Sequence, residues 1–436
     1  MKRLLSLLLC AVLALFCATT AQAAGVSITL TASEYALHYA FDAGAQDPFV
    51  ILEYATPAEK GWMMLYSEDG HFEGDVSLAY SGAGGKTSVA LTSARTTGSI
   101  GKASTTLPKA ADYQKPTGKS NAKVMDFVLT ETPEGFHYAF NAAGTDYMLL
   151  YWRSKEQTVT QPVYPDENGH YEGDIISELT FAVQVKSGSG SMKKEATVRK
   201  GYQAPEAPQR QEGRLSGVTV CIDAGHQENG RFVNEPIGPG LTGSTSGKGG
   251  MAQGTKTNRR ESIVCLEIGM LLRDELLRQG ANVIMTREDQ MTFHTNIERC
   301  EIAEAGGAQI MLRLHCNNSS NHSKRGIQVY GPLNSDYAKA VADADTYREM
   351  GQKLLDAMKT RVGMTLANST GMVRLNDNYV GNNWAKMMCF LVEMGYLSNP
   401  AEEYLLVTPV YQQWLAEGMA DGVYEIAVAR GWVQAQ

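Results

Sequence analysis

Two kinds of hydrophobic pattern divide this chain. Between about residues 25 and 200, apolar and aromatic residues alternate with polar ones, and Gly, Asp and Asn interrupt the runs. This alternation is typical of antiparallel strands. Beyond about residue 217, short β-branched runs such as "GVTVCID" alternate with longer amphipathic runs such as "ESIVCLEIGMLLRDELLRQG". Alternating strands and helices predict an α/β domain with a mostly parallel or mixed sheet and flanking helices.

The β-rich half contains an internal duplication. The sequence "HYAF" at residues 38–41 recurs at residues 137–140, and "GHFEGD" at residues 70–75 recurs as "GHYEGD" at residues 169–174. Both matches have the same offset of 99 residues, which indicates a duplicated unit rather than chance. We therefore expect two tandem small β-sandwich-like repeats.

Histidines occupy matching places in the two repeats, His38 with His137 and His71 with His170. Because a duplicated fold keeps its structural residues first, we expect them to hold turns or strand faces, with a ligand role as the alternative. Exposed aromatic residues of the repeats could bind sugars, although aromatic residues at strand spacing more often belong to a core.

The first 23 residues have the pattern of a secretory signal peptide. Lys2 and Arg3 form a basic start, an apolar middle follows, and small residues stand at Ala21 and Ala23. The segment is too short and wrongly flanked for a stable membrane anchor. Cleavage after Ala23 is predicted, and we expect the protein to be exported.

These patterns predict five segments in order along the chain. They are a signal peptide (1–23), β-rich repeat 1 (24–110), β-rich repeat 2 (120–200), a linker (201–216) and the α/β domain (217–436). The linker contains the Pro-rich and polar stretch "YQAPEAPQRQEGR", which separates the two kinds of pattern.

Charge and cysteine content argue against a nucleic-acid partner and against a disulfide framework. Loss of Lys2 and Arg3 would take the formal net charge from −8 to −10 and leave nothing basic that argues for nucleic acid as a partner. An odd number of cysteines inside apolar runs indicates buried small hydrophobic residues rather than a disulfide framework. The cysteines that follow the signal peptide are Cys221, Cys265, Cys300, Cys316 and Cys389.

Polar groups end three of the predicted strands of the α/β domain. "TVCIDAGH" ends in His226, "IMLRLH" in His315 and "CFLVE" in Glu393, while Glu261 begins a helix after a long Gly-rich loop. Sites of α/β sheets lie at the carboxyl ends of strands. Two imidazoles and one carboxylate form a catalytic zinc set that leaves a position open for water, and a second carboxylate can act as general base.

Each of these residues also has a simpler structural explanation. A strand-terminal histidine is often a satisfied loop residue, and Glu261 could be a favourable acid in the first helical turn. Glu393 follows an unbroken apolar run, where a carboxylate needs a partner or a shifted pKa. Together the four residues favour a metallohydrolase.

From Gly217 to about Leu406, the chain resembles the zinc-dependent N-acetylmuramoyl-L-alanine amidases, bacterial cell-wall enzymes whose catalytic domain begins with Asp-x-Gly-His. The segments that carry the resemblance, in the family's order, are "IDAGH", "RRESIVCLEIGMLLRDELLRQGANVIMTRE", "LRLHCN" and "FLVEMGYLSNPAEEYLL". The last includes the Ser-Asn pair after the glutamate and is the most specific.

This resemblance implies a reaction and a role for each residue. His226, Glu261 and His315 would bind Zn²⁺, and Glu393 would be the catalytic acid/base. The substrate would be peptidoglycan, cleaved at the amide between the lactyl group of N-acetylmuramic acid and L-alanine. Export agrees with that substrate, and the resemblance implies an extracellular, cell-wall-associated protein.

The chain departs from the family pattern at two places. Gln227 stands where the family often has a second glycine after the first histidine, although some similar members carry glutamine. A long Gly-rich loop over residues 227–260 separates His226 from Glu261. It could be a flexible flap beside the metal, an inhibitory segment or a passive insertion.

Other residues are weaker candidates. Asp223 could orient a metal ligand or merely cap the turn. Arg374 and Asn383 lie upstream of the Glu393 strand, where contacts with substrate are plausible. His294 and His322 are expected at the surface rather than in a metal site.

Three alternatives to a zinc amidase stay open. A non-catalytic protein could use its repeats to bind the cell wall or a protein partner, with an inert amidase-like domain. A zinc peptidase could cut within the stem peptide instead. A cysteine hydrolase based on Cys316 is disfavoured, because strand alternation points its thiol away from His315 and no orienting partner is evident.

Overall fold

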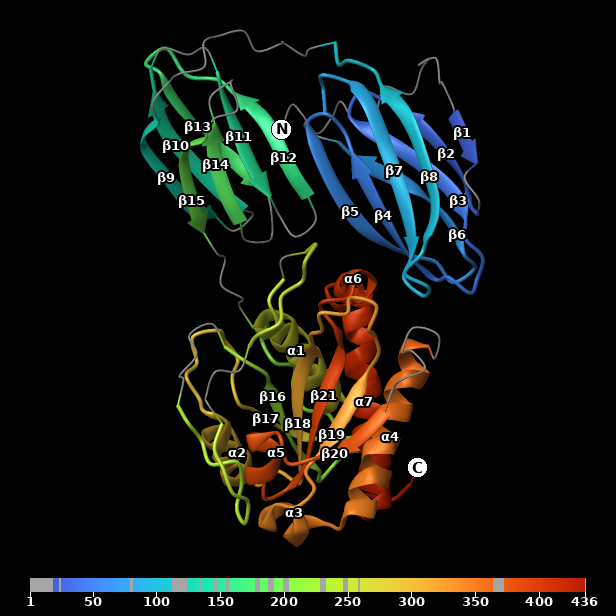
Figure 1. The fold of residues 1–436 in the computed structure, drawn as a ribbon, viewed down its shortest axis with the longest axis vertical. Helices are drawn as coiled ribbons and strands as arrows, with labels where there is room; N and C mark the ends of the chain where they lie inside the picture. Colours follow the sequence, from blue (N-terminus) through green and yellow to red (C-terminus); the bar gives the residue numbers. More distant parts are fainter. Residues whose placement is uncertain are drawn as a thin grey trace. The chain divides into compact units, whose positions relative to one another are not determined.

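The protein is described by a computed structural model that divides into two compact units at residue 200 (Figure 1). It describes residues 19–22, 25–78, 81–111, 124–132, 135–143, 147–153, 157–176, 181–186, 192–198, 204–227, 233–245, 250–257, 259–363 and 372–435. The predicted signal peptide lies largely outside these residues. Within them, none of the helices is long and apolar enough to cross a membrane.

The N-terminal unit is built of antiparallel strands, which confirms the expectation of a β-rich region. β1 (Thr19–Gln22) lies within the predicted signal peptide and pairs with β2 (Ser27–Ala32). In repeat 1 the strands are β2, β3 (Ala36–Asp42), β4 (Phe49–Ala55), β5 (Glu59–Tyr66), β6 (His71–Ser77), β7 (Gly85–Ser93) and β8 (Ser99–Leu107). In repeat 2 they are β9 (Val124–Thr132), β10 (Gly135–Ala142), β11 (Met148–Arg153), β12 (Gln157–Val163), β13 (His170–Ile176), β14 (Phe181–Lys186) and β15 (Met192–Val198).

Each repeat encloses its own hydrophobic core between two sheets. In repeat 1, inward residues such as Leu30 of β2 and Phe41 of β3 meet Leu52 of β4 and Leu91 of β7, and all are buried. In repeat 2, residues of β10 and β13 meet β11 and β12 around the fully buried Trp152. Alternation of apolar and polar residues places one face of each strand in such a core.

The sequence did not reveal that the two repeats share a sheet. β12 pairs antiparallel with β5 over a short stretch, Gln157 opposite Gly61 to Val159 opposite Glu59. This pairing joins the strands in the order β15-β14-β11-β12-β5-β4-β7-β8. It covers an edge of each repeat that would otherwise expose unpaired backbone groups.

The duplicated histidines form matching contacts across strands, as expected of structural residues. His38 lies opposite Asp75, with Nδ1 3.1 Å from Oδ1, and the equivalent His137 lies 2.9 Å from Asp174. His170 Nδ1 lies 2.8 Å from Asn141 Oδ1. These pairs lie on outer strand faces.

The C-terminal unit has a mixed sheet with flanking helices, as predicted. The strands are β16 (Thr219–Ala224), β17 (Asn282–Met285), β18 (Ile310–Asn317), β19 (Gln328–Gly331), β20 (Met372–Leu375) and β21 (Met388–Tyr396), in the order β17-β16-β18-β21-β19-β20. Every neighbouring pair is parallel except β19 and β21, which are antiparallel.

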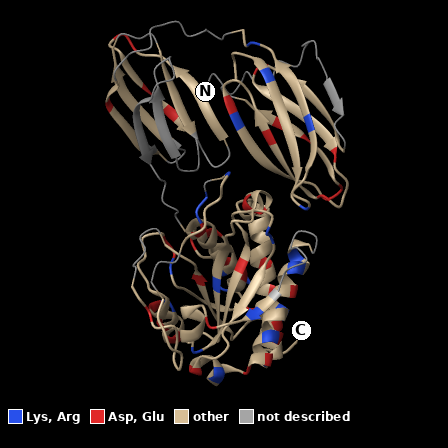
Figure 2. Ribbon diagram, viewed as in Figure 1, with Lys and Arg blue, Asp and Glu red and all other residues tan. Residues whose placement is uncertain are grey.

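Helices cover both faces of this sheet (Figure 1). They are α1 (Glu261–Arg278), α2 (Asn296–Ala305), α3 (Asp336–Val341), α4 (Ala344–Val362), α5 (Val380–Trp384), α6 (Pro400–Leu406) and α7 (Pro409–Ala429). α1 and α4 pack on the strands and α7 packs on both helices, whereas α2 covers the other face through a core that includes Cys300. Charged residues of both signs occur along α4, where the ribbon of Figure 2 is blue and red.

Local sequence signals explain where the helices begin and end. α2 begins with a capping box, in which the Thr295 side chain accepts from Glu298 N and the Glu298 carboxylate accepts from Thr295 N. Just after α1, Gly280 has a φ of 96°, a conformation that favours glycine. The five cysteines are all buried and unpaired, in agreement with the sequence analysis.

Candidate metal centre

Three side chains converge at the carboxyl edge of the mixed sheet. His226 follows β16, His315 lies near the end of β18, and Glu261 is the first residue of α1. Glu261 Oε1 lies 3.1 Å from His226 Nε2 and 3.0 Å from His315 Nδ1. All three ligand atoms lie within 4.8 Å of one another.

The backbone around His226 is shaped for this position. Gly225 N donates to Leu314 O at 2.9 Å, which brings the end of β16 against β18. A Cβ atom on Gly225 would overlap Leu314 O and lie 2.6 Å from His315 Cε1, so only glycine fits. His226 itself has a φ of 58°, in the left-handed region that costs non-glycine residues free energy. Arg299 Nη2 donates to its carbonyl at 3.1 Å.

Backbone donors orient the Glu261 carboxylate. Oε1 accepts from Cys316 N at 3.0 Å and Oε2 accepts from Ala252 N at 2.7 Å. Burial alone would raise the pKa of Glu261, but hydrogen bonds with His226 and His315 hold it well below the usual range. The pKa of His315 is lowered, chiefly by burial. The site therefore favours an ionised carboxylate and a neutral imidazole, the forms that bind metals.

Glu393 lies beside this cluster on the neighbouring strand. It is directly opposite His315 in the parallel register of β18 and β21. Its Oε2 is buried and has no hydrogen-bond partner among the described residues. Burial, and then the Glu261 carboxylate, raise the pKa of Glu393 to about 8. A buried carboxylate with an unpartnered oxygen is costly for stability, which is typical of a functional group.

The donor set fits a zinc ion. Bonds of about 2.0–2.1 Å in a tetrahedral arrangement place neighbouring ligand atoms roughly 3.3 Å apart. The two separations at Glu261, 3.1 and 3.0 Å, are close to that value. Two imidazole nitrogens with one carboxylate oxygen suit zinc better than they suit magnesium or calcium, which prefer oxygen ligands.

Asp223 lies on β16, three residues before His226, and connects neighbouring elements through its carboxylate. Its fully buried carboxylate accepts from Thr286 Oγ1 at 2.7 Å, Arg299 Nη1 at 2.5 Å and Arg313 Nε at 2.8 Å. Burial would raise the pKa of Asp223, but the two guanidinium groups hold it well below its usual range. Arg299 contacts both Asp223 and the His226 carbonyl, so Asp223 influences this ligand through the backbone.

The two predicted substrate contacts lie in different environments. Arg374 is exposed on β20, opposite Tyr330 of β19. Burial, and then Glu393, raise the pKa of Tyr330, and the positive charge of Arg374 partly offsets this rise. Asn383 is fully buried and donates to Ile237 O at 3.1 Å and Asp377 O at 2.9 Å. In this conformation Asn383 holds the surrounding loops and has no surface for a substrate.

Several residues that support the site were not evident from the sequence. Arg287 donates to Ala224 O, and α6 contributes Glu403, whose Oε1 accepts from Lys256 N at 2.7 Å in the loop before Glu261. One signal was available for Arg313, since an arginine inside the apolar run "IMLRLH" requires a buried acid. His294 and His322 do not join the metal-ligand group that the structure brings together within its described residues.

Comparison with known proteins gives this site a context. Residues 220–425 match the family described as N-acetylmuramoyl-L-alanine amidase. The chain is 26% identical over 231 residues to the germination-specific N-acetylmuramoyl-L-alanine amidase of Bacillus subtilis, covering 50% of this chain and 83% of that one. It is also 26% identical over 218 residues to the probable cell wall amidase LytH of Staphylococcus aureus, covering 49% of this chain and 60% of that one.

Similarity to solved structures falls on the same half of the chain. The N-acetylmuramoyl-L-alanine amidase from Clostridium difficile 630 aligns with a TM-score of 0.40 and 24% identity, covering 50% of this chain and 100% of that chain. The enzyme Ami1 from Mycobacterium smegmatis aligns with a TM-score of 0.44 and 17% identity, covering 50% of this chain and 100% of that chain.

Proposed function

Because residues 220–425 match the N-acetylmuramoyl-L-alanine amidase family, we propose that this protein is a secreted, zinc-dependent peptidoglycan hydrolase. It cleaves the amide between the lactyl group of N-acetylmuramic acid and the L-alanine of the stem peptide. The observation that carries the proposal is the convergence of two imidazoles and a carboxylate beside a second carboxylate with an unpartnered oxygen.

In this proposal His226, Glu261 and His315 hold the zinc ion. When bound, the ion supplies a Lewis acid that polarises the amide carbonyl and lowers the pKa of water. Hydrogen bonds from Ala252 N and Cys316 N fix the Glu261 carboxylate, so its orientation does not depend on the metal. Buried Arg299 fixes the His226 carbonyl in the same way.

Glu393 is the proton carrier of the proposed reaction. Its unpartnered oxygen accepts the proton of the attacking water and then transfers it to the leaving amine. A raised pKa suits this second step, because a carboxylate that holds a proton near neutral pH can return it as an acid. A bound cation would lower that pKa and favour the carboxylate form for the first step.

Digestion of purified peptidoglycan tests the reaction. The protein without residues 1–23 is incubated with the wall in the presence and absence of a zinc chelator, and products are identified by mass spectrometry. Release of stem peptides that begin at L-alanine, only when zinc is present, supports the proposal. Fragments cut within the stem peptide would replace it with a zinc peptidase, and an intact wall would favour a binding protein.

Secretion is tested separately. The culture medium and the cell wall fraction of a producing bacterium are analysed for the mature N-terminus. A mature chain that begins at Ala24 supports export through the signal peptide, whereas an uncleaved chain retained in the cell contradicts it.

A further inference from the structure

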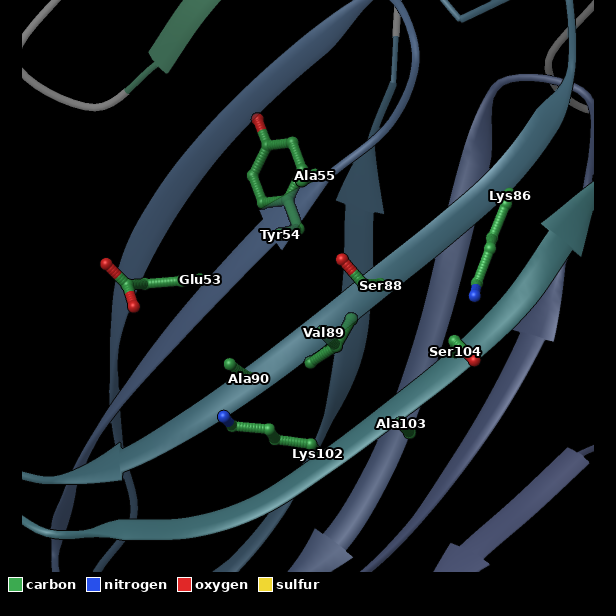
Figure 3. Close-up of a pocket in the computed structure, with 10 residues that line it drawn as sticks. All are labelled: Glu53, Tyr54, Ala55, Lys86, Ser88, Val89, Ala90, Lys102, Ala103 and Ser104. Atoms are coloured by element: carbon green, nitrogen blue, oxygen red, sulfur yellow. The ribbon is translucent and has the colours of Figure 1, made fainter.

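The outer face of the repeat 1 sheet is hollowed, and the proposed reaction uses none of its side chains. β4, β7 and β8 are neighbours there and line an open groove of about 540 Å³ (Figure 3). The outward residues form two rows across the strands, Glu53–Ala90–Lys102 and Ala55–Ser88–Ser104. Small side chains form the floor, which leaves room for a ligand against the sheet.

Two lysines give the groove its charge. Lys102 ends one row, and Lys86 of β7 lies two residues before Ser88. Both are exposed, and among the residues that the structure describes neither ammonium group has a hydrogen-bond or ion-pair partner. In Figure 3 the Lys86 side chain points toward Ser104, while the Lys102 side chain points toward Ala90. The groove therefore offers two separate, unpaired positive charges.

The spacing of these charges favours a linear anionic chain over a single small anion. Lys86 lies opposite Thr106 of β8, four residues from Lys102. Four residues of strand correspond to about 13 Å at 3.3–3.4 Å per residue. Two lysines whose backbone positions lie this far apart along the strands, with Ser88 and Ser104 near Lys86, match a polymer that carries repeated anions and hydroxyl groups.

The proposed reaction produces such a polymer. Hydrolysis breaks the amide C–N bond: the lactyl carbonyl carbon gains the water oxygen and becomes a carboxylate, and the nitrogen takes up both water protons and leaves as the ammonium group of L-alanine. Each cleaved muramic acid therefore gains a negative charge on the glycan strand, where the substrate has a neutral amide.

We propose that the groove of β4, β7 and β8 binds the carboxylate-bearing glycan strand that remains after stem peptides are removed. This proposal rests on the proposed function. Lys86 and Lys102 contact carboxylates, and the serine hydroxyls contact sugar hydroxyls. Glu53 at the other end of its row accepts from hydroxyl or acetamido N–H groups.

Binding of defined ligands to the full mature chain tests the proposal. The protein carries Glu393→Gln to prevent turnover, and the probes are glycan strands stripped of peptides by a different amidase, intact peptide-bearing strands and free stem peptides. Affinities are measured by titration calorimetry. We expect stripped strands to bind more tightly than the other two probes, and added salt to weaken that binding.

Substitution of the lysines locates the site. Lys86→Gln with Lys102→Gln is expected to weaken binding of stripped strands about tenfold, since each exposed charge contact is modest. Lys339→Gln with Lys353→Gln, in the C-terminal unit, makes the same charge change and should leave affinity unaltered. Because Lys86 and Lys102 are exposed, the double variant should fold, which its thermal midpoint checks.

The outcomes separate this proposal from the proposed reaction. Equal binding of intact and stripped strands, tighter binding of free stem peptides, or no effect of the lysine pair would overturn the groove assignment. Each of these results is compatible with normal amidase activity of the unsubstituted protein. Conversely, lysine-dependent binding of stripped strands, together with no release of stem peptides by the unsubstituted protein, would overturn the reaction while leaving the groove intact.

Discussion

At the scale of single residues, the proton carrier is the sharpest assignment to test. Glu393→Gln preserves shape and removes the base, so we expect the rate of peptide release to fall about 10²- to 10⁴-fold. The three metal ligands are untouched, and the zinc content measured by elemental analysis should remain one per chain. Glu349→Gln, an exposed change of the same kind on α4, is the control. A normal rate in Glu393→Gln would exclude Glu393 as the base.

Gly225 tests whether the close approach of two strands matters for the metal. A methyl group there would overlap Leu314 O and press on the His315 ring. We expect Gly225→Ala to weaken zinc affinity about 10- to 100-fold, the range seen when groups that orient ligands are changed. Competition with a chelator of known affinity measures this change. Gly250→Ala, where a methyl group meets open space, serves as the control, and equal affinities would contradict the argument.

The raised pKa of Glu393 predicts how stability depends on pH. The pKa lies at about 8 in the folded chain and near 4.5 in an exposed glutamate. The folded, metal-free protein therefore binds this proton more tightly than the unfolded chain. The resulting stabilisation is fully present below about pH 4.5 and is lost as pH rises through about 8. This loss lowers the free energy of unfolding by on the order of a few kcal/mol.

Denaturant titrations of the metal-free protein at several pH values check this prediction. Glu402 and Glu403, whose pKa values burial raises to about 7, contribute a similar slope in every variant. Glu393→Gln should therefore flatten the pH dependence without abolishing it. Identical slopes in the two proteins would show that Glu393 does not titrate in this way.

At the scale of elements, one buried carboxylate connects four parts of the C-terminal unit. Asp223 of β16 binds Thr286 after β17, Arg299 of α2 and Arg313 of β18. Asp223→Ala would leave two buried guanidinium groups uncompensated, so we expect a loss of about 3–5 kcal/mol in the free energy of unfolding. The exposed pair Asp345–Arg348 offers the control, because Asp345→Ala should cost less than about 1 kcal/mol.

The elements also show what the sequence could predict. His226, His315 and Glu393 end or lie near the ends of adjacent parallel strands, and such ends meet at one edge, so their grouping followed from the strand pattern. Arg299 escaped notice because its partner Asp223 is 76 residues away and nothing local requires the pair. The left-handed backbone conformation of His226 depends on tertiary contacts, which the hydrophobic pattern of the sequence does not predict.

At the scale of the whole molecule, the sequence revealed the duplication in the N-terminal unit but not how the two repeats pair. The repeat was evident from matching motifs at one offset, but the β12–β5 pairing depends on a few backbone hydrogen bonds between strands without a distinctive pattern. Matching motifs also do not imply matching surfaces. The lysines of the repeat 1 groove have no equivalent in the motifs that the repeats share, "HYAF" and "GHFEGD" or "GHYEGD".

Separation of the two units tests how catalysis and binding are divided. Arg273 donates to Pro205 O and Arg210 donates to Gly280 O, so the linker from residue 204 packs on the C-terminal unit and belongs in the fragment. Because residues 204–436 contain the whole mixed sheet and the metal ligands, we expect this fragment to fold and to retain zinc. It should release stem peptides from soluble, peptide-bearing strands at a rate close to that of the full mature chain.

On insoluble wall, the digestion rate of the same fragment should drop below that of the full chain as digestion proceeds. Stripped strands accumulate as stem peptides leave, and only a chain that carries the repeat 1 groove can use them to stay attached. We therefore expect the two time courses to begin together and then diverge, and the full chain with Lys86→Gln and Lys102→Gln to follow the fragment. If the fragment and full chain digest wall in parallel throughout, the groove does not contribute to retention on the product.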